Sequence, residues 1–458
     1  MKQIFGLLII IYAIVFFVCD FQISSIDSIS HWGIVGWGQL IYSIYTWRKY
    51  GNRIISPYII FLLCFYVFNF GQCLLFPLGV EFSDHELIGY LGITVSGIYK
   101  AEIYTLMMLA AFHLGALLFC EKKNKVFKLQ PDFNEHKITK IGWVLLLVSI
   151  VPYYYELIQN MLFSITYGYA VLYEREESIG IATIWSHVAD FFIPACVCLY
   201  VGYHNNRKLQ ILIEVLILVN VAILFVTGGR GGGVILLGLL IVLYNYVYKA
   251  FTNKQIIVLC FGGILLLSVL STIADNRNTS DRTFELYASD QNSNNPAVQA
   301  IAEMGGSMAC LIKTQELVPQ TEDFRYGSTY LYAFTTIIPN WGFWDIHPAK
   351  KGANMSDWLT NKLMLGYGTG FSMSAEAYIN FGAFGWIIMI LLGYLLSWAF
   401  SYVEVGVNSK NAPMIIFPMI LFFFCLKIPR SNFISIVRPF FFYALPIYYL
   451  CKSRIRKK

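Results

Sequence analysis

The residues of this sequence that are most suited to chemistry are arginines in or beside long apolar runs. Arg230 interrupts the run FVTGGRGGGVILLGLL, and Arg430 and Arg438 lie in LKIPRSNFISIVRPFFFY. A charge close to the membrane core is costly and usually marks a functional site. The planar guanidinium group binds two oxygens of one phosphate at the same time. These arginines therefore predict a site for an anionic ligand that contains phosphate.

The spacing around each arginine leaves a structural alternative open. The glycines beside Arg230 should break the helix at the outer surface, where free backbone N–H groups would form an anion site, or they form a tight turn while Arg230 reaches toward headgroups. Roughly two helical turns separate Arg430 from Arg438, so both can face one stripe, although Arg430 also suits an interface anchor. Arg277 follows another apolar run and has an acidic neighbour, Asp275, which equally fits a solvated loop.

Three side chains in or beside a long polar stretch are suited to proton transfer. Glu376 lies in GFSMSAEAYINFGAFGW, Glu303 lies in AIAEMGGSM, and His347 lies in WGFWDIHPAKKGAN. Group transfer to a hydroxyl needs a base that takes its proton, and a partly buried glutamate can do so. The alternatives are that Glu376 only meets a helix dipole, that Glu303 pairs within its loop, and that His347 is a surface residue.

Aromatic residues are frequent in the same stretch, among them Tyr326 and Trp341. Aromatic faces stack on sugars, although an ordinary aromatic belt at the membrane interface has the same composition. The sequence contains no DxD motif or carboxylate cluster suited to a divalent ion, and no P-loop or dinucleotide fingerprint. We therefore expect no metal ion or organic cofactor, because arginines can stabilise a leaving phosphate themselves.

The elements that must position these residues are membrane-spanning helices. Hydrophobic residues make up 57% of the 458 residues and charged residues only 13%, against about 25% charged residues in a soluble domain. Apolar runs of about 20 residues predict twelve spans. They lie near residues 4–20, 30–47, 55–76, 101–120, 139–159, 183–203, 209–228, 232–249, 255–273, 372–400, 412–429 and 432–451. We predict an all-α, polytopic bundle.

The basic residues indicate how the bundle is oriented. They gather in alternate loops, namely 48–53, 121–128, 204–208, the loop with Lys249 and Lys254, and the tail CKSRIRKK. The positive-inside rule places these loops in the cytoplasm. Both termini are then cytoplasmic. The prediction divides the chain into spans at 1–273, one long extracytoplasmic, catalytic loop at 274–371, and further spans with a basic tail at 372–458. A loop of this length is usually functional.

Taken in order along the chain, the motifs resemble a known family. These are TGGRGGG between two spans, AIAEMGGSM, FRYGSTYLYAFTTIIPNW, GFSMSAEAYINFGAFGW and the arginine pair near the end. Their order around a long outer loop resembles that of the oligosaccharide repeat-unit polymerases, the Wzy-type O-antigen polymerases of bacterial surface polysaccharide assembly. The topology resembles the family over nearly the whole chain, and the specific motifs lie between about 220 and 440.

The resemblance implies a GT-C-like enzyme of the inner membrane with its active site on the outer face. Such an enzyme transfers a polysaccharide from undecaprenyl diphosphate to a new lipid-linked repeat unit, without a metal, and it works beside a flippase and a chain-length regulator. Carried over to this chain, Arg230, Arg277, Arg430 and Arg438 would hold diphosphates. Glu376 or Glu303 would match acidic positions of the family, and His347 stays a candidate because related ligases use a loop histidine.

Two other functions stay open at this point. An O-antigen ligase is a neighbouring enzyme that would have the same kind of helical membrane fold. A flippase for lipid-linked oligosaccharides would also carry charged residues within the membrane. The unusual charges here gather on the predicted outer side, whereas a flippase would line a path through both leaflets. We therefore expect a polymerase.

Overall fold

The computed structural model describes residues 1–19, 25–80, 87–126, 130–168, 181–276, 295–338, 340 and 344–453. These residues form helices and turns, and within these ranges no β-strand occurs. The expected all-α fold is therefore confirmed. The candidates Arg277 and Trp341 lie outside the described residues.

The described residues divide into two compact units. Unit 1 comprises Met1–Phe127, Asn294–Ala399 and Leu426–Val437, and unit 2 comprises Lys128–Ser293, Phe400–Cys425 and Arg438–Lys458. Helices of unit 1 are α1 (Lys2–Val18), α2 (Ile26–Lys49), α3 (Pro57–Leu75), α4 (Val95–Val126), α12 (Pro296–Gly305), α13 (Met308–Leu317), α14 (Ser328–Ala333), η6 (Phe334–Ile337), α15 (Pro348–Gly352), α16 (Met355–Lys362), α17 (Met373–Phe381) and η8 (Ile428–Arg430). Helices of unit 2 are α5 (Glu135–Tyr167), α6 (Ile181–Ala189), α7 (Phe192–Gly202), α8 (Arg207–Thr227), α9 (Arg230–Leu243), η5 (Tyr244–Tyr248), α10 (Asn253–Asn276), α19 (Pro413–Cys425), η9 (Phe440–Ala444) and α21 (Leu445–Cys451). Helices α18 (Trp386–Asn408) and α20 (Ile434–Pro439) contribute residues to both units.

Each of the twelve apolar runs coincides with one helix or with consecutive helices. In the described part of the chain, nine helical segments are long and apolar enough to cross a membrane, and Lys2–Val18 and Asn253–Leu266 are shorter apolar helices. The remaining predicted span, α2, carries polar side chains such as Gln39 and Ser43 on its buried face. The chain is thus an integral membrane protein with many spans, while the count of twelve stays a prediction.

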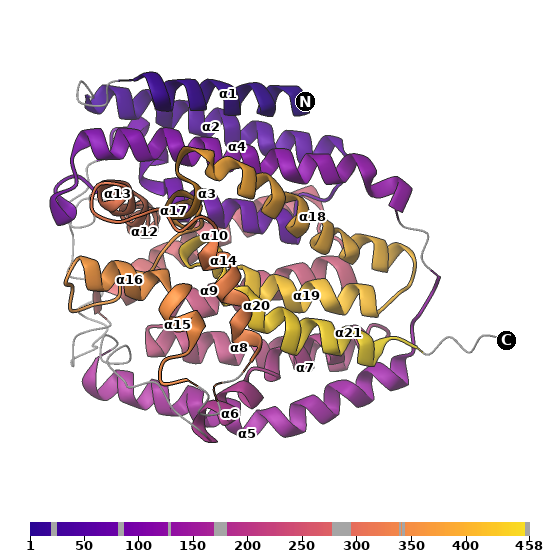
Figure 1. Ribbon diagram of the computed structural model, residues 1–458. Helices are drawn as coiled ribbons and strands as arrows, with labels where there is room; N and C mark the ends of the chain where they lie inside the picture. The colour runs from indigo at the N-terminus through magenta and orange to yellow at the C-terminus, as the bar shows by residue number, and fades with distance from the viewer. Residues whose placement is uncertain are drawn as a thin grey trace. The chain divides into compact units, whose positions relative to one another are not determined.

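In unit 1, α1, α2 and α4 run side by side (Figure 1). Helices α4 and α18 approach closely because both have glycine at the contact. A Cβ atom on Gly115 would overlap the carbonyl oxygen of Ile390, and one on Gly393 would overlap that of Phe112. Small residues at such contacts let helix backbones pack tightly in a membrane, where burial of apolar surface supplies little driving force.

In unit 2, α5 contacts α6, α7 and α8, and α19 contacts α7, α9 and α21. Glycine again sets the closest approach, because a Cβ atom on Gly142 of α5 would press against the side chain of Leu199 in α7. Helix α7 is buried along its whole length. Its cysteines, Cys196 and Cys198, are buried free thiols and so belong to this packing.

The predicted outer loop is folded wherever the structure describes it. The described residues between 295 and 371 form α12 to α16 and belong to unit 1. Gly305 in AIAEMGGSM is required for packing, because a Cβ atom there would overlap the backbone of Gln72 in α3. The Gln72 side chain also donates to the Ala302 carbonyl oxygen over 2.8 Å. Helix α12 is thereby fixed against α3.

Candidate functional site

Glu376 lies in the first turn of α17 and is almost completely buried, with 2% of its surface exposed. The helix begins there because Ser372 accepts a hydrogen bond from the N–H of Ala375, which caps the N-terminus. One carboxylate oxygen, Oε1, accepts a hydrogen bond from the Thr329 hydroxyl over 3.0 Å. The other, Oε2, accepts one from the backbone N–H of Phe433 over 2.6 Å. Both oxygens are therefore held in fixed positions.

Asn380, one helical turn after the carboxylate, completes this network. Its Nδ2 donates to the Thr329 hydroxyl over 2.7 Å and to the Glu376 carbonyl oxygen over 2.8 Å. Its Oδ1 accepts from the N–H of Gly327 over 2.9 Å. Residues four apart lie on one helix face, so α17 presents Glu376 and Asn380 together to the start of α14. The FRYGST motif is thereby tied to the motif that contains the carboxylate.

A small pocket lies beside this carboxylate and is walled mainly by apolar side chains. Its lining consists of Tyr330, Met373, Glu376, Leu392, Leu396, Ile428, Phe433 and Ile436. Burial raises the pKa of Tyr330 well above its usual value, and the charge of Glu376 contributes in the same direction. An oriented carboxylate in a mainly apolar pocket suits proton abstraction from a hydroxyl group, and this arrangement needs no further titratable group.

Arg430 lies in the turn between α19 and α20, and the turn is fixed from two sides. Asn69 of α3 donates to the Pro429 carbonyl oxygen over 2.7 Å, and the N–H of Phe433 donates to the carboxylate of α17. The Arg430 side chain is exposed, and its guanidinium lies 6.0 Å from the centre of the Phe68 ring. Within the described part of the chain no carboxylate forms an ion pair with it, so its charge is available to an anion.

Arg438, in unit 2, contacts a histidine that sequence reasoning did not single out. Its Nη1 lies 3.1 Å from Nε2 of His187, which is in the last turn of α6. Close by, the Tyr443 hydroxyl donates to Oδ2 of Asp190 over 3.0 Å and to the His187 carbonyl oxygen over 3.3 Å. Arg438 and His187 are 251 positions apart in the chain, and a lone histidine near an apolar run carries no signal that would have paired them.

Arg230 begins α9, directly after the glycine cap of α8. Gly228 has φ +92°, which is the left-handed conformation that favours glycine at a helix end. The prediction that free backbone N–H groups surround this turn is wrong for most of them. The N–H groups of Gly229, Arg230 and Gly232 already donate to carbonyl oxygens of the same turn, at 2.8, 2.9 and 3.1 Å. Any anion contact here must come mainly from the half-buried guanidinium.

His347 caps the short helix α15 with one ring nitrogen and binds a neighbouring loop with the other. Its Nδ1 accepts from the N–H of Ala349 over 3.1 Å. Its Nε2 lies 2.9 Å from the Ile338 carbonyl oxygen, and because a carbonyl only accepts, Nε2 must donate. This assigns the neutral tautomer with the proton on Nε2, and both ring nitrogens are engaged.

The two other described candidates lie in separate parts of unit 1. Glu303 is half-buried in α12. Tyr326 lies just before α14, with 80% of its surface exposed and a φ of +47°. Neither residue lines the pocket beside Glu376, so the structure brings together Glu376, Tyr330 and the Arg430 turn within unit 1.

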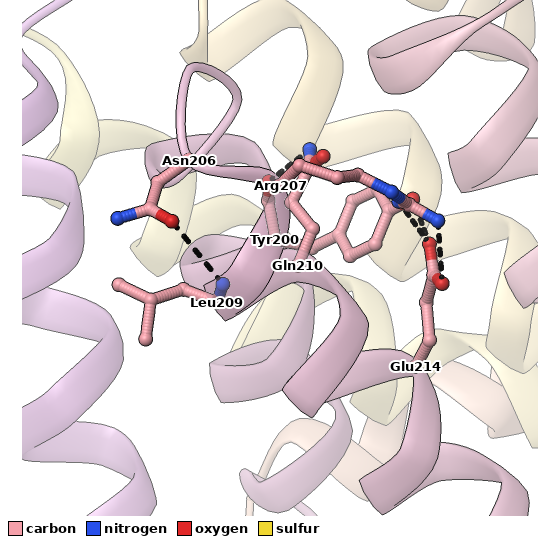
Figure 2. Close-up of polar contacts among 6 residues, drawn as sticks. All are labelled: Tyr200, Asn206, Arg207, Leu209, Gln210 and Glu214. Carbon is pink, nitrogen blue, oxygen red and sulfur yellow. Dashed lines mark hydrogen bonds and ion pairs between the residues drawn. The ribbon is translucent and has the colours of Figure 1, made fainter.

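A second arginine cluster in unit 2 was not predicted and is shown in Figure 2. Arg207, at the start of α8, donates from Nη1 and Nη2 to the two oxygens of Glu214 over 2.6 and 2.9 Å. The Tyr200 hydroxyl donates to the same carboxylate over 2.7 Å, and the guanidinium lies 3.9 Å from the Tyr248 ring centre. Asn206 caps the helix by accepting from the N–H of Leu209. Both arms of this guanidinium are thus occupied by a carboxylate of the protein itself.

Comparison with known proteins points to one family. The family model described as O-antigen polysaccharide polymerase Wzy matches residues 3–457, nearly the whole chain. No curated protein and no solved structure matches the chain.

Proposed function

Because the chain belongs to the O-antigen polysaccharide polymerase Wzy family, we propose that it joins oligosaccharide repeat units carried on a lipid diphosphate into a surface polysaccharide. The family match over residues 3–457 carries the proposal. The buried, doubly hydrogen-bonded Glu376 beside a pocket supplies a group for the chemistry. The substrates are undecaprenyl-diphosphate-linked oligosaccharides, and a flippase and a chain-length regulator are the proposed partners.

In the proposed reaction Glu376 takes the proton of the attacking sugar hydroxyl. The hydroxyl oxygen forms a bond to the anomeric carbon of the growing chain, while the bond from that carbon to the lipid diphosphate breaks. The diphosphate leaves with the bonding electron pair, and its negative charge is stabilised by arginines in place of a metal ion. The hydrogen bonds from Thr329 and Phe433 support this role because they orient the carboxylate before the hydroxyl arrives.

The arginines divide between two roles in this proposal. Arg230 and Arg438 orient the diphosphate leaving group, while Arg430 and Arg277 assist. The exposed guanidinium of Arg430 supports its part, because it forms no ion pair with a carboxylate of the described residues and so retains its charge for an anion. Glu303, His347, Tyr326 and Trp341 stay candidates; Tyr326 and Trp341 are proposed to stack on sugars.

We place the protein in the inner membrane with both termini cytoplasmic and the active site on the outer face. Contacts at the ends of the helices support this arrangement. In unit 1, Lys2 pairs with Glu121, which lies near the end of α4 and beside Cys120, the partner of Asn52. The N-terminus and two of the predicted cytoplasmic loops therefore meet at one end of unit 1.

Contacts in unit 2 also agree with the predicted orientation of the loops. Asn205 donates to Glu135 over 2.8 Å, and the N–H of Ser453 in the tail donates to Asp132 over 3.0 Å. The loops around 130–135 and 204–208 and the C-terminal tail thus share one end, as the positive-inside rule requires.

The deciding experiment is extension of a defined undecaprenyl-diphosphate-linked repeat unit by the purified, full-length protein. We expect a ladder of products with the wild type and none with Glu376→Gln, which keeps the size of the side chain but removes the base. Glu316→Gln, at an exposed carboxylate of unit 1, is the matched control and should extend normally per folded molecule. Extension by Glu376→Gln with normal chain lengths removes this residue from the mechanism.

Arg230→Ala should also abolish extension while the protein still inserts and folds. In cells, the gel pattern separates the polymerase from a ligase, because a polymerase variant leaves single repeat units attached whereas a ligase variant loses all attachment. An unchanged ladder in Arg230→Ala contradicts the assignment of this arginine.

A further inference from the structure

The Asn380 amide belongs to the carboxylate network but has no part in the proposed reaction. Its side chain is fully buried, and it does not line the pocket beside Glu376. We propose that Asn380 is a positioning residue, a role that rests on the proposed function. It directs the hydroxyl hydrogen of Thr329 toward Glu376 and so orients the base for the sugar hydroxyl. The residues that carry this role, in α14, α17 and the Arg430 turn, all belong to unit 1.

Two backbone groups fix which end of the Asn380 amide faces which partner. The N–H of Gly327 can only donate, so the amide oxygen Oδ1 must face it, at 2.9 Å. The carbonyl oxygen of Glu376 can only accept, so the amide nitrogen Nδ2 must face it, at 2.8 Å. An amide turned by half a rotation would place donor against donor and acceptor against acceptor at these two contacts. The nitrogen is therefore also the atom that lies 2.7 Å from the Thr329 hydroxyl oxygen.

The orientation of the amide in turn fixes the hydrogen of the Thr329 hydroxyl. Its oxygen accepts from Asn380 Nδ2, and an amide nitrogen cannot accept a hydrogen in return. The other partner that the structure gives this hydroxyl is Oε1 of Glu376, at 3.0 Å, so its single hydrogen points to the carboxylate. The N–H of Phe433 donates to the second oxygen. Both oxygens of Glu376 are thus acceptors, as a group that takes a proton requires.

Burial makes the direction of this hydrogen important. Thr329 is fully buried, as is Asn380, so bulk water does not replace a hydrogen bond that either side chain loses. With Asn380 in place, Thr329 donates in one direction, and Glu376 is oriented before the substrate hydroxyl arrives. Without the Asn380 donor the hydroxyl can rotate away from Oε1, and the carboxylate loses one of the two donors that orient it. Asn380 therefore acts through Thr329.

The test is the kinetics of extension of a defined undecaprenyl-diphosphate-linked repeat unit by the purified full-length protein, per folded molecule. Asn380→Leu has the same branching but no polar atom, and should lower kcat about tenfold. The KM for the repeat unit should stay within about twofold of wild type, because the orientation of the base affects proton transfer rather than binding. Asn380→Asp keeps the size and the acceptor for Gly327. Its carboxylate attracts the Thr329 hydrogen away from Glu376, so it should show the same loss of kcat.

Variants of Thr329 separate positioning from a general effect on packing. Thr329→Val removes the hydroxyl and should also lower kcat about tenfold, whereas Thr329→Ser keeps it and should stay within about threefold of wild type. Thr329→Val combined with Asn380→Leu should lose about as much as either change alone, because Asn380 acts through the hydroxyl. The matched control is Asn361→Leu, at an exposed asparagine of α16, which should extend like wild type.

The outcomes separate the role of Asn380 from the proposed function. If the wild type extends the repeat unit and a folded Asn380 variant has the wild-type kcat, the role of Asn380 is overturned and the proposed function stands. A loss of about 100-fold in the double variant, or a rise in KM in place of the fall in kcat, overturns the role in the same way. If the wild type does not extend lipid-linked repeat units, the proposed function fails and the role of Asn380 fails with it.

Discussion

Arg207 and Arg438 lie in the same unit and have different partners. Arg207 binds a carboxylate with both terminal nitrogens of its guanidinium (Figure 2). The rings of Tyr248 and Tyr244 also lie beside it, with centres 3.9 and 5.5 Å away. Arg438 contacts the imidazole of His187, which accepts a single hydrogen bond. The contact with Glu214 is an ion pair, whereas the contact of Arg438 Nη1 with His187 Nε2 is a hydrogen bond to a ring nitrogen.

The partners of Arg207 and Arg438 distinguish two uses of arginine in a membrane protein. A guanidinium that is paired with a carboxylate costs little at the membrane boundary and anchors the helices around it. A guanidinium with an imidazole among its partners has N–H groups that this partner does not use, and these can donate to an anionic ligand. Four predictions test this distinction, beginning with the largest expected effect.

The largest effect should come from Arg438→Ala, which on the proposed function removes charge-assisted hydrogen bonds to the diphosphate and should reduce polymer extension about 100-fold or more. The measurement is the product ladder in membranes, normalised to the amount of folded protein. The control is the double variant Arg207→Ala with Glu214→Ala, which removes the closed pair together and should extend normally per folded molecule. A wild-type product ladder from Arg438→Ala would show that Arg438 and Arg207 do not differ in their importance for extension.

A second prediction concerns a carboxylate added at the Arg438 site. His187→Glu places a carboxylate beside Arg438, and the resulting ion pair should compete with phosphate and lower extension about tenfold. His187→Gln, which keeps the acceptor neutral, is the control and should retain most of the activity. Equal activity of the two variants would show that the charge of the partner is unimportant.

The third prediction concerns stability at the closed cluster. Arg207→Ala leaves the Glu214 carboxylate without its cation and should lower the free energy of unfolding by about 1–2 kcal/mol, a value reduced from that of a fully buried pair. The reduction is needed because 32% of the Arg207 side chain is exposed. Thermal melting in detergent measures the loss, and extension per folded molecule should stay at the wild-type level.

The smallest effect is expected at the aromatic face of the same arginine. Tyr248→Leu keeps an apolar side chain but removes the ring that faces the guanidinium, and should cost about 0.5–1 kcal/mol of stability. The same melting experiment detects this loss. Tyr155→Leu, at an exposed tyrosine of α5, makes the same chemical change as a control and should melt like wild type. Arg207→Ala removes both the ion pair and the contact with the ring. If Tyr248→Leu lowers the stability by as much, the ring contributes more to stability than the ion pair does.

The helical segments could be predicted from the sequence because hydropathy is a local property of about 20 consecutive residues. Each predicted run is helical in the structure. The outer stretch was harder, because short helices such as α14 and α15 are set by contacts that a hydropathy window cannot detect. Two glycine-containing motifs illustrate this limit. Gly305 of AIAEMGGSM permits close packing on α3, whereas backbone N–H groups of TGGRGGG donate to carbonyl oxygens of their own turn.

Residue type and position identified Glu376, Arg430 and Arg438 as candidates, since charges in apolar surroundings are conspicuous in any sequence. Their hydrogen-bond partners could not be predicted in this way. Thr329 and Phe433 lie 47 and 57 positions from Glu376, and the choice between them and other polar residues depends on how α14, α17 and the Arg430 turn pack.

By itself the sequence determined that this chain is a helical membrane protein, where its apolar helices lie, and which family it resembles, because composition and the order of motifs are written along the chain. Only the tertiary structure decided which arginine binds a carboxylate with both terminal nitrogens and which contacts an imidazole. Arg207 and Arg438 are the same residue type beside apolar runs, and what separates them is the side chain that folding brings to within hydrogen-bonding distance.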